Sequence, residues 1–308
     1  MVKRVARYTI AFILYYSGLI AVLRFLQRHR GTIKILVYHR VNDSLEGSSP
    51  ILTVAQFKKH MAYLKKHYTT IGLRSAAEHI TNKTKLGADA VSVTFDDGYK
   101  DVINTVLPIM KQYNIPLTIF LSSGLMGDTQ LLWTDALYFY FKDKDSKSEF
   151  EKYRENLKHV DNAERLRLLK EIPMRAKAGL MMNWEDVKQL NNENLVEIGA
   201  HSVHHPVLTR VAIEEASKEI RESKKDIEEI IGRPVYGFSY PAGKYNEAIK
   251  RCVTECGFEY ACTVNGRFVT NDSEVYSLGR INIDNCPVFV FAAELCGILN
   301  WGRRIIYS

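Results

Sequence analysis

The stretch VSVTFDDGYKD, residues 91–101, reads as a strand that ends in two adjacent carboxylates. Its first half is apolar or β-branched, which is typical of a strand buried in a core. Asp96 and Asp97 follow directly, and a glycine comes next. A buried charge without a partner is strongly destabilising, so we expect a positive group beside these aspartates. The alternative is a simple turn in which an aspartate caps the following helix.

The rest of the chain repeats this strand pattern between helical segments. Six further apolar, β-branched or aromatic stretches lie at 33–39, 117–122, 195–201, 235–241, 258–264 and 276–283. Helical periodicity appears between them, at 54–67, 101–113, 212–232 and 245–257. Strands that alternate with helices predict a parallel α/β fold, and seven continuously apolar strands favour a barrel. No glycine-rich phosphate loop follows the first strand, so we expect no nucleotide cofactor.

One long segment interrupts the alternation of strands and helices. Residues 133–183 separate the third predicted strand from the fourth, and their middle is charged and helical. We interpret this segment as a solvated helical insertion, and the alternative is a lid over the mouth of the barrel. The predicted catalytic domain spans residues 32–308 and includes the insertion.

The N-terminus differs from the rest in charge and hydropathy. Residues 1–34 contain seven Lys or Arg and no acid, while the whole chain carries +7, so residues 35–308 are neutral. This distribution argues against a nucleic-acid partner and favours a membrane surface. Because residues 8–23 contain no charge, we predict that residues 1–31 form a membrane-anchoring helix. An interfacial helix and a cleaved signal are the alternatives, and the basic flanks leave the orientation open.

Ionisable residues stand at the predicted strand ends, where parallel α/β proteins place their chemistry. His39 ends the first strand, the two aspartates end the second and His201 ends the fourth. His205 follows four residues after His201. Two histidines and one carboxylate form a common three-ligand metal site that leaves a position for water. One aspartate is then a metal ligand, and the other is a general base.

The position of His204 leaves an ambiguity in this assignment. We predict that His204 is a solvent-facing turn residue. A shift of one residue in the turn would instead make His204 the metal ligand in place of His205.

Three motifs resemble those of the polysaccharide deacetylases, the NodB-homology or carbohydrate esterase family 4 group. They are TFDDGY (94–99), HSVHHP (201–206) and FSYPAGKYN (238–246). The resemblance covers roughly residues 33–286. It implies a distorted (β/α)7 TIM-like barrel, a divalent metal that is usually zinc, and removal of N-acetyl or sometimes O-acetyl groups from glycans.

The resemblance also assigns roles to individual residues. Asp96 matches the family's catalytic base. Asp97, His201 and His205 match its metal ligands. Many members carry a Leu-x-His motif whose histidine is the general acid, but the matching place here reads Leu278-Gly279-Arg280.

A second stretch offers a replacement for the missing acid. ILVYHRV (35–41) resembles the permuted branch that includes poly-N-acetylglucosamine deacetylases, in which a first-strand histidine supplies the proton. We therefore predict that His39 is the general acid, and the alternative is a histidine that merely packs at the end of the barrel.

The motif FSYPAG departs from the family's pattern as well. Many members have Arg-x-Pro-Tyr, in which the Arg orients the base and the Tyr backbone N–H binds the oxyanion. Here Ser239 and Ala242 stand in those places. A backbone N–H survives a change of side chain, so Ala242 is the predicted oxyanion donor. Orientation of the base would then require Arg280 or Arg40. The predicted substrate-binding residues are Tyr99, Tyr240, Pro241, Ala242 and Arg280.

Together these features predict a membrane-associated, metal-dependent glycan N-deacetylase. Its expected partner is an acetylated glycan or a lipid-linked amino sugar. Two alternatives remain, an O-acetyl carbohydrate esterase of the same fold and a non-catalytic glycan-binding protein.

Overall fold

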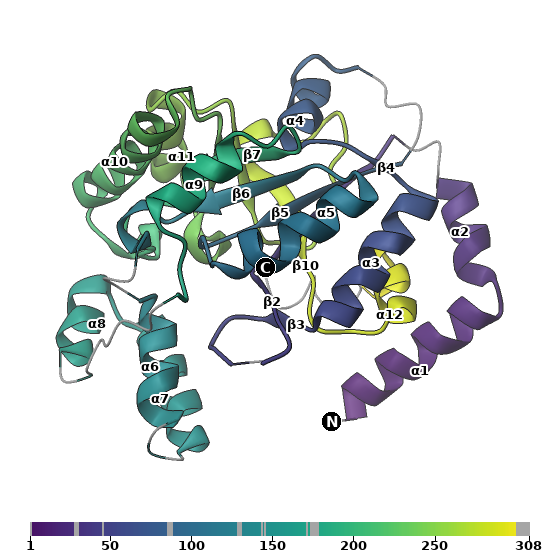
Figure 1. The fold of residues 1–308 in the computed structure, drawn as a ribbon, viewed down its shortest axis with the longest axis horizontal. Helices are drawn as coiled ribbons and strands as arrows, with labels where there is room; N and C mark the ends of the chain where they lie inside the picture. The colour runs from purple at the N-terminus through teal and green to yellow at the C-terminus, as the bar shows by residue number, and fades with distance from the viewer. Residues whose placement is uncertain are drawn as a thin grey trace.

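The computed structural model describes residues 2–27, 31–44, 46–84, 89–127, 131–142, 144, 146–170, 172 and 179–299. Its centre is a closed barrel of seven parallel strands (Figure 1). In chain order they are β1 (Ile33–Tyr38), β5 (Ala90–Phe95), β6 (Leu117–Leu121), β7 (Val196–Ala200), β8 (Gly237–Ser239), β9 (Tyr260–Thr263) and β10 (Leu278–Asn282). Pairing of β1 with both β10 and β5 closes the barrel, which confirms the predicted fold class.

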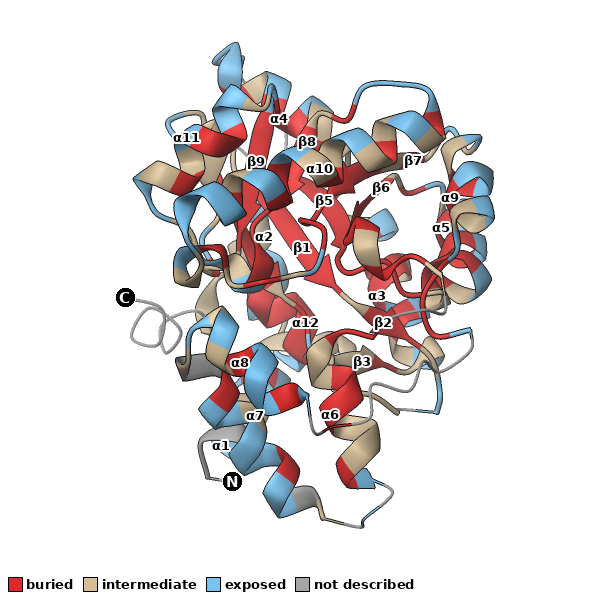
Figure 2. Ribbon diagram, turned by 90° about the vertical axis from the view of Figure 1, so that its left-hand side faces the viewer, coloured by how far each residue is buried: buried red, intermediate tan, exposed pale blue. Residues whose placement is uncertain are grey.

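The barrel strands are buried on both faces, which explains their continuous apolar sequences. Every residue of β1, β5 and β6 is buried, and Figure 2 shows these strands in red beneath partly exposed helices. A short strand, β4 (Thr69–Thr70), pairs with β5 outside the closed ring. Because all seven strands run parallel, the residues that end them meet at one mouth.

Helices cover the outside of the barrel. They are α3 (Val54–His67), α4 (Leu73–Thr81), α5 (Leu107–Tyr113), α9 (Trp184–Asn191), α10 (Ile213–Ile231), α11 (Glu247–Glu255) and α12 (Val288–Leu295). The ends follow ordinary capping rules: the Thr53 side chain accepts from the Gln56 N–H before α3, and Gly232 ends α10 in the left-handed conformation. The helix predicted at 101–113 begins as a π-helical turn, Val102–Val106.

The insertion forms three helices, α6 (Trp133–Lys142), α7 (Lys147–His159) and α8 (Asn162–Leu169). They bury a small core of their own, in which Leu137, Phe141 and Phe150 pack together. The helical character expected for residues 133–183 is therefore present in the described part of the segment. Residues 143, 145, 171 and 173–178 lie outside the described residues, and a role as a lid stays a prediction.

The N-terminal segment is not the single helix that the sequence predicts. It forms α1 (Val2–Tyr16) and α2 (Leu19–Gln27), whose apolar parts, from Val5 onward, meet at an angle of 79°. Gly18 lies at the break with a φ of +80°, a conformation that ends α1. In the described chain, no single helix is long and apolar enough to cross a membrane, although the bent pair passes that test by length and composition.

Candidate metal and catalytic site

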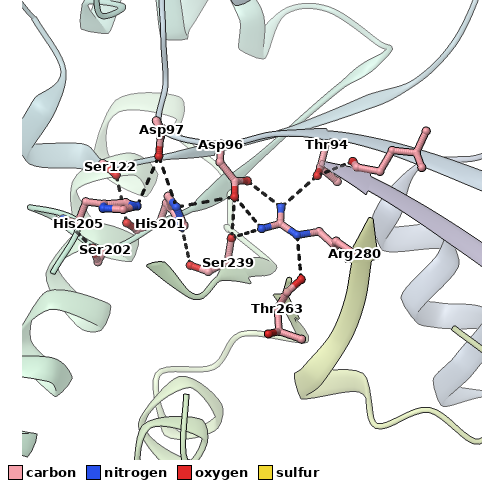
Figure 3. Close-up of polar contacts among 11 residues, drawn as sticks. Thr94, Asp96, Asp97, Ser122, His201, Ser202, His205, Ser239, Thr263 and Arg280 are labelled. Carbon is pink, nitrogen blue, oxygen red and sulfur yellow. Dashed lines mark hydrogen bonds and ion pairs between the residues drawn. The ribbon is translucent and has the colours of Figure 1, made fainter. Parts of the chain in front are cut away.

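Asp97, His201 and His205 converge at the mouth of the barrel (Figure 3). One ligand atom from each lies within 4.8 Å of the other two. The Nε2 atoms of His201 and His205 each lie 3.6 Å from Asp97 Oδ1, which is too far for a hydrogen bond. That oxygen is buried and has no hydrogen-bond partner among the described residues. An orphaned carboxylate oxygen facing two imidazole nitrogens fits the open three-ligand site of a divalent cation.

The imidazole of His201 is oriented for this role by the neighbouring strand. Its Nδ1 lies 2.6 Å from the carbonyl oxygen of Ser239. Because a carbonyl can only accept, Nδ1 carries the proton and the lone pair of Nε2 faces Asp97. This outer hydrogen bond is the usual way in which a protein fixes the tautomer of a metal-binding histidine.

The structure places His205, not His204, beside Asp97. The His204 side chain is 57% exposed, and its Nδ1 lies 2.8 Å from Glu219 Oε1. Glu219 also accepts the backbone N–H groups of Val203 and His204, so it holds the whole turn. The turn thereby directs His205 inward, and its backbone N–H donates to Ser202 Oγ at 3.0 Å.

The electrostatics of the cluster show a shortage of positive charge. Burial raises the pKa of Asp97 well above its usual range, and the charge of Asp96 adds to this effect. Burial lowers the pKa of His205 well below its usual range, and it lowers that of His201 as well. A divalent cation would stabilise the ionised carboxylate and use both neutral imidazoles as ligands.

Asp96 has its own positive partner in Arg280 (Figure 3). Arg280 Nη1 donates to Asp96 Oδ1 at 2.7 Å, and Nη2 donates to Oδ2 at 2.6 Å. Burial alone would raise the pKa of Asp96, but the Arg280 guanidinium outweighs it and holds that pKa well below the usual range. Arg40 does not take this part, because its Nε binds Asp101 Oδ2 at 2.9 Å.

Arg280 is fully buried, yet each of its nitrogens has a partner. Besides Asp96 it donates to Thr94 Oγ1 at 3.0 Å, Ser239 Oγ at 2.8 Å and the Thr263 carbonyl at 3.3 Å. Ser239 stands where the family often has an arginine. The small serine leaves room for a guanidinium from β10, and its hydroxyl binds that guanidinium directly.

His39 lies between β1 and β2 (Arg40–Val41), next to the same mouth. Burial lowers its pKa to about 4, while the nearby charge of Asp96 opposes that shift. The imidazole is therefore neutral near pH 7. Its Nδ1 is buried without a hydrogen-bond partner in the described structure, and its role as general acid stays a prediction.

Two of the predicted substrate-binding residues have hydroxyl groups that are already engaged. Tyr99 donates to Asp135 Oδ2 at 2.6 Å, and Tyr240 donates to the Tyr276 carbonyl at 3.0 Å. Both tyrosines are fully buried. Contact of either residue with a substrate stays a prediction, and within this structure they support the walls of the mouth.

Asp135 is a residue that the sequence reasoning missed. It is fully buried at the start of α6, and it also accepts from the Ser48 backbone N–H at 2.9 Å and the Ser48 hydroxyl at 2.7 Å. Through Tyr99 it joins the insertion to the loop that carries Asp97. The available signal was an acidic residue within the apolar run LLWTDALYFYF, residues 131–141.

Unusual backbone conformations gather around the site. The non-glycine residues with positive φ include Asp97 (77°), Ser202 (62°), His205 (55°) and Ala242 (56°). Each such residue costs of the order of 1–3 kcal/mol and persists only where its surroundings impose the conformation. Ala242 belongs to the turn Pro241–Gly243, in which Pro241 is buried and Ala242 is exposed. The residue that carries the predicted oxyanion donor therefore lies at the surface.

Comparison with known families matches the part of the chain that contains Asp96, Asp97, His201 and His205. A sequence model described as "Polysaccharide deacetylase" matches residues 83–261, more than half of the chain. "Putative polysaccharide deacetylase YxkH" of Bacillus subtilis is 22% identical over 252 residues, which cover 82% of this chain and 71% of that protein. "Poly-beta-1,6-N-acetyl-D-glucosamine N-deacetylase" of Staphylococcus epidermidis is 23% identical over 273 residues, which cover 84% and 82%.

Solved structures share the fold at low sequence identity. The structure of IcaB from Ammonifex degensii superposes with a TM-score of 0.61 at 19% identity, covering 86% of this chain and 97% of that one. The Streptococcus pyogenes deacetylase PplD in complex with acetate gives a TM-score of 0.60 at 17% identity, covering 82% and 92%. These similarities establish the barrel architecture.

We expect the three ligand residues to be required for metal binding. Asp97→Ala, His201→Ala and His205→Ala should each lose bound metal, because a three-ligand site seldom tolerates the loss of one ligand. The matched control is His204→Ala, which removes the neighbouring exposed imidazole and should leave metal content unchanged. The measurement is metal content together with melting temperature on zinc titration. Added zinc should stabilise the wild type and His204→Ala only. Full metal content in His205→Ala would contradict the assignment.

The ion pair between Asp96 and Arg280 predicts a pH-dependent loss of stability in Arg280→Gln. The variant should unfold more easily by about 3–5 kcal/mol at pH 7, because it leaves a buried carboxylate unpaired. In the wild type the lowered pKa of Asp96 contributes stability above the unfolded value of about 4, and this is lost as pH falls. In the variant burial raises that pKa, so the deficit should grow as pH rises from about 4 to 7.

Urea unfolding of Arg280→Gln at several pH values measures this deficit. Arg251→Gln, which changes an exposed arginine of α11, is the control and should match the wild type. A deficit that does not change with pH would contradict the charge-based explanation.

Proposed function

Because the chain belongs to the polysaccharide deacetylase family, we propose that it removes N-acetyl groups from an amino-sugar-containing glycan in a metal-dependent hydrolysis. One observation carries the proposal, the convergence of Asp97, His201 and His205 beside a buried Asp96 that is paired with Arg280. A metal site and a separately stabilised carboxylate at one mouth provide the two functions that amide hydrolysis needs, activation of a water molecule and acceptance of its proton. The name of the staphylococcal relative, an N-deacetylase, supports an amide as the target.

Asp97, His201 and His205 would hold the metal. A divalent cation bound there supplies Lewis acidity and lowers the pKa of water from 15.7 to about 7. The donor set of two imidazoles and one carboxylate suits zinc, which is the metal that we propose.

Asp96 is the proposed general base. Its two oxygens are held by the two nitrogens of Arg280, so the carboxylate stays ionised and keeps one orientation. Asp96 Oδ2 lies 3.8 Å from His201 Nε2, next to the metal ligands. From this position it can accept the proton of the water that attacks the acetamide carbonyl carbon.

The remaining steps use Ala242 and His39. The Ala242 backbone N–H, in an exposed turn at the mouth, would donate to the oxygen that becomes negative as the carbonyl carbon turns tetrahedral. Breaking the C–N bond requires a proton on the leaving nitrogen. His39 is neutral near pH 7, so we propose that it receives the proton that Asp96 removed and passes it to the amine. Acetate and a free amino sugar are the products.

We expect the wild-type protein with zinc to release acetate from N-acetylated glycans, and a chelator to abolish this activity. Asp96→Asn should retain its metal but lose about 10²–10⁴-fold in kcat, the usual scale for a positioned base. The substrate panel should contain an N-acetylated polymer, a lipid-linked N-acetylated amino sugar and an O-acetylated glycan. Release from the O-acetylated glycan alone would replace the proposal by an esterase. No release by fully metallated protein would favour a glycan-binding role. Loss of metal from Asp96→Asn would show that Asp96 is a ligand.

The acid role of His39 predicts a difference between two kinds of leaving group. His39→Ala should slow N-deacetylation far more than hydrolysis of an aryl acetate, because a phenolate leaves without protonation and an amine does not. Metal content should not change, since His39 does not belong to the ligand group. The measurement is kcat on both substrates, with His204→Ala as the control. Equal slowing on both would leave His39 as a packing residue.

A further inference from the structure

The outer face of α1 and α2 is apolar and exposed. Nine of the thirteen exposed large hydrophobic side chains in the described chain belong to these two helices, with 43–66% exposure. They are Val5, Ile10, Phe12, Ile13, Tyr16, Leu19, Val22, Phe25 and Leu26. A helix on the surface of a soluble protein normally turns a polar face outward. Exposed apolar side chains concentrated in this way on one pair of helices indicate an interaction site.

The opposite face of the helix pair is fixed to the barrel. Ala11 and Ile20 are buried, and Arg7 forms an ion pair with the buried Glu294 of α12. Gln27 Nε2 donates to the Cys296 carbonyl at 3.1 Å, immediately after α12. Figure 1 shows the pair on the outside of the barrel, beside α3 and α12. While these contacts hold, neither helix can leave the barrel wall to cross a bilayer.

The geometry of the pair also favours a position in the membrane plane. α1 has 15 residues, a length of about 22 Å, whereas the hydrocarbon core is about 30 Å thick. The bend of 79° prevents α2 from extending it along one axis. Interfacial helices instead lie flat, with the apolar side toward the acyl chains and basic residues near the headgroups.

A basic hollow lies along the edge of this apolar face. A cavity of about 500 Å³ lies beside α2 and is lined by Arg24, Phe25, Lys66 and His67, among others. Phe25 belongs both to the cavity and to the apolar face. Lys66 has no carboxylate partner among the described residues, and Arg24 Nη1 donates to the neutral hydroxyl of Tyr63 at 3.1 Å.

One acidic residue lines the hollow, but it is already neutralised. Asp89 accepts from the buried Lys34 Nζ at 2.8 Å and from Thr32 Oγ1 at 2.9 Å. Burial, together with the positive charges of Arg24 and Lys66, lowers the pKa of His67 to about 4. The hollow therefore carries uncompensated positive charge beside an apolar surface, which is complementary to an anionic phospholipid: phosphate beside acyl chains.

We propose that α1 and α2 form an in-plane membrane-docking surface that binds bilayers rich in anionic phospholipid. The outer apolar face enters the interface between headgroups and acyl chains. A lipid phosphate occupies the hollow formed by Arg24 and Lys66. This inference does not depend on the deacetylase activity.

The test uses full-length protein and sedimentation with vesicles of phosphatidylcholine, with or without 30% phosphatidylglycerol. Wild type should bind the anionic vesicles. Lys66→Gln should weaken that binding about fivefold, because each basic residue near an anionic surface strengthens binding by about that factor. The double variant Arg24→Gln/Lys66→Gln should weaken it about 30-fold. Ile13→Asp/Phe25→Asp should abolish binding to the anionic vesicles. The controls are Leu166→Asp, an exposed apolar residue of α8, and Lys152→Gln, an exposed lysine of α7, and both should bind as wild type.

Depth measurements distinguish docking in the plane from spanning. Val5→Trp and Val22→Trp, one in each helix, should be quenched equally by lipids brominated near the headgroup and weakly by lipids brominated near the chain ends. Unequal depths, with one tryptophan near the bilayer centre, would overturn the in-plane arrangement. A failure of wild type to bind anionic vesicles would overturn the proposal. So would a stable dimer that Ile13→Asp dissociates, because a second copy would then cover the apolar face. Unchanged binding by Lys66→Gln and the double variant would overturn the phosphate site.

Discussion

The site depends on the buried ion pair between Arg280 and Asp96. Two adjacent aspartates at the end of a buried strand repel each other and lose their hydration, so each requires a positive partner. Arg280 stabilises one of them with two hydrogen bonds, and its remaining N–H groups donate to Thr94, Ser239 and Thr263. Because these partners come from β5, β8 and β9, the same guanidinium also joins three strands to β10. Asp97 is left with one oxygen that has no hydrogen-bond partner among the described residues, facing the two histidines of the candidate metal site.

The positive-φ residues show how the barrel directs side chains toward the candidate metal site. Asp97, Ser202 and His205 leave their strands in left-handed conformations, which turn the chain sharply and bring the two imidazoles close to one carboxylate oxygen. Such conformations persist only where surrounding contacts impose them. Glu219 provides part of that constraint, because it binds two successive backbone N–H groups of the histidine turn. The geometry of the candidate metal site is therefore built into the backbone as well as into the side chains.

Most of the barrel was predictable because local sequence determines it. A strand buried on both faces is mostly apolar, and all seven predicted strands are present. The helix α12 (VFVFAAEL) was not predicted from the sequence, because all of its residues except Glu294 are apolar and they show no helical period. The break between α1 and α2 at Gly18 was not predicted either, because the sequence does not show whether a single glycine within an apolar run has a positive φ. The partner of Asp96 lies 184 positions away, so the sequence alone could not decide between Arg280 and Arg40. The closed barrel places Arg280 beside Asp96.

Both His39 and Arg280 lie outside the segment matched by the family's sequence model, residues 83–261. Because β1 and β10 close the barrel, His39 and Arg280 nevertheless lie beside the site that the matched segment carries.

The helix pair α1–α2 runs along one side of the barrel and reaches both of its ends. Arg7 and Tyr8 line a cavity with Asn282–Cys286, beyond the C-terminal end of β10. Arg24 and Phe25 line the other hollow beside Thr69 and Asp89, near the N-terminal end of β5. A barrel docked through this side would lie with its axis along the bilayer, and its mouth would open parallel to the lipid surface. The enzyme would then search for its substrate in two dimensions, along the membrane surface. Its turnover would depend on the surface density of acetylated chains within about one barrel radius of the headgroups, and not on their concentration in bulk solution.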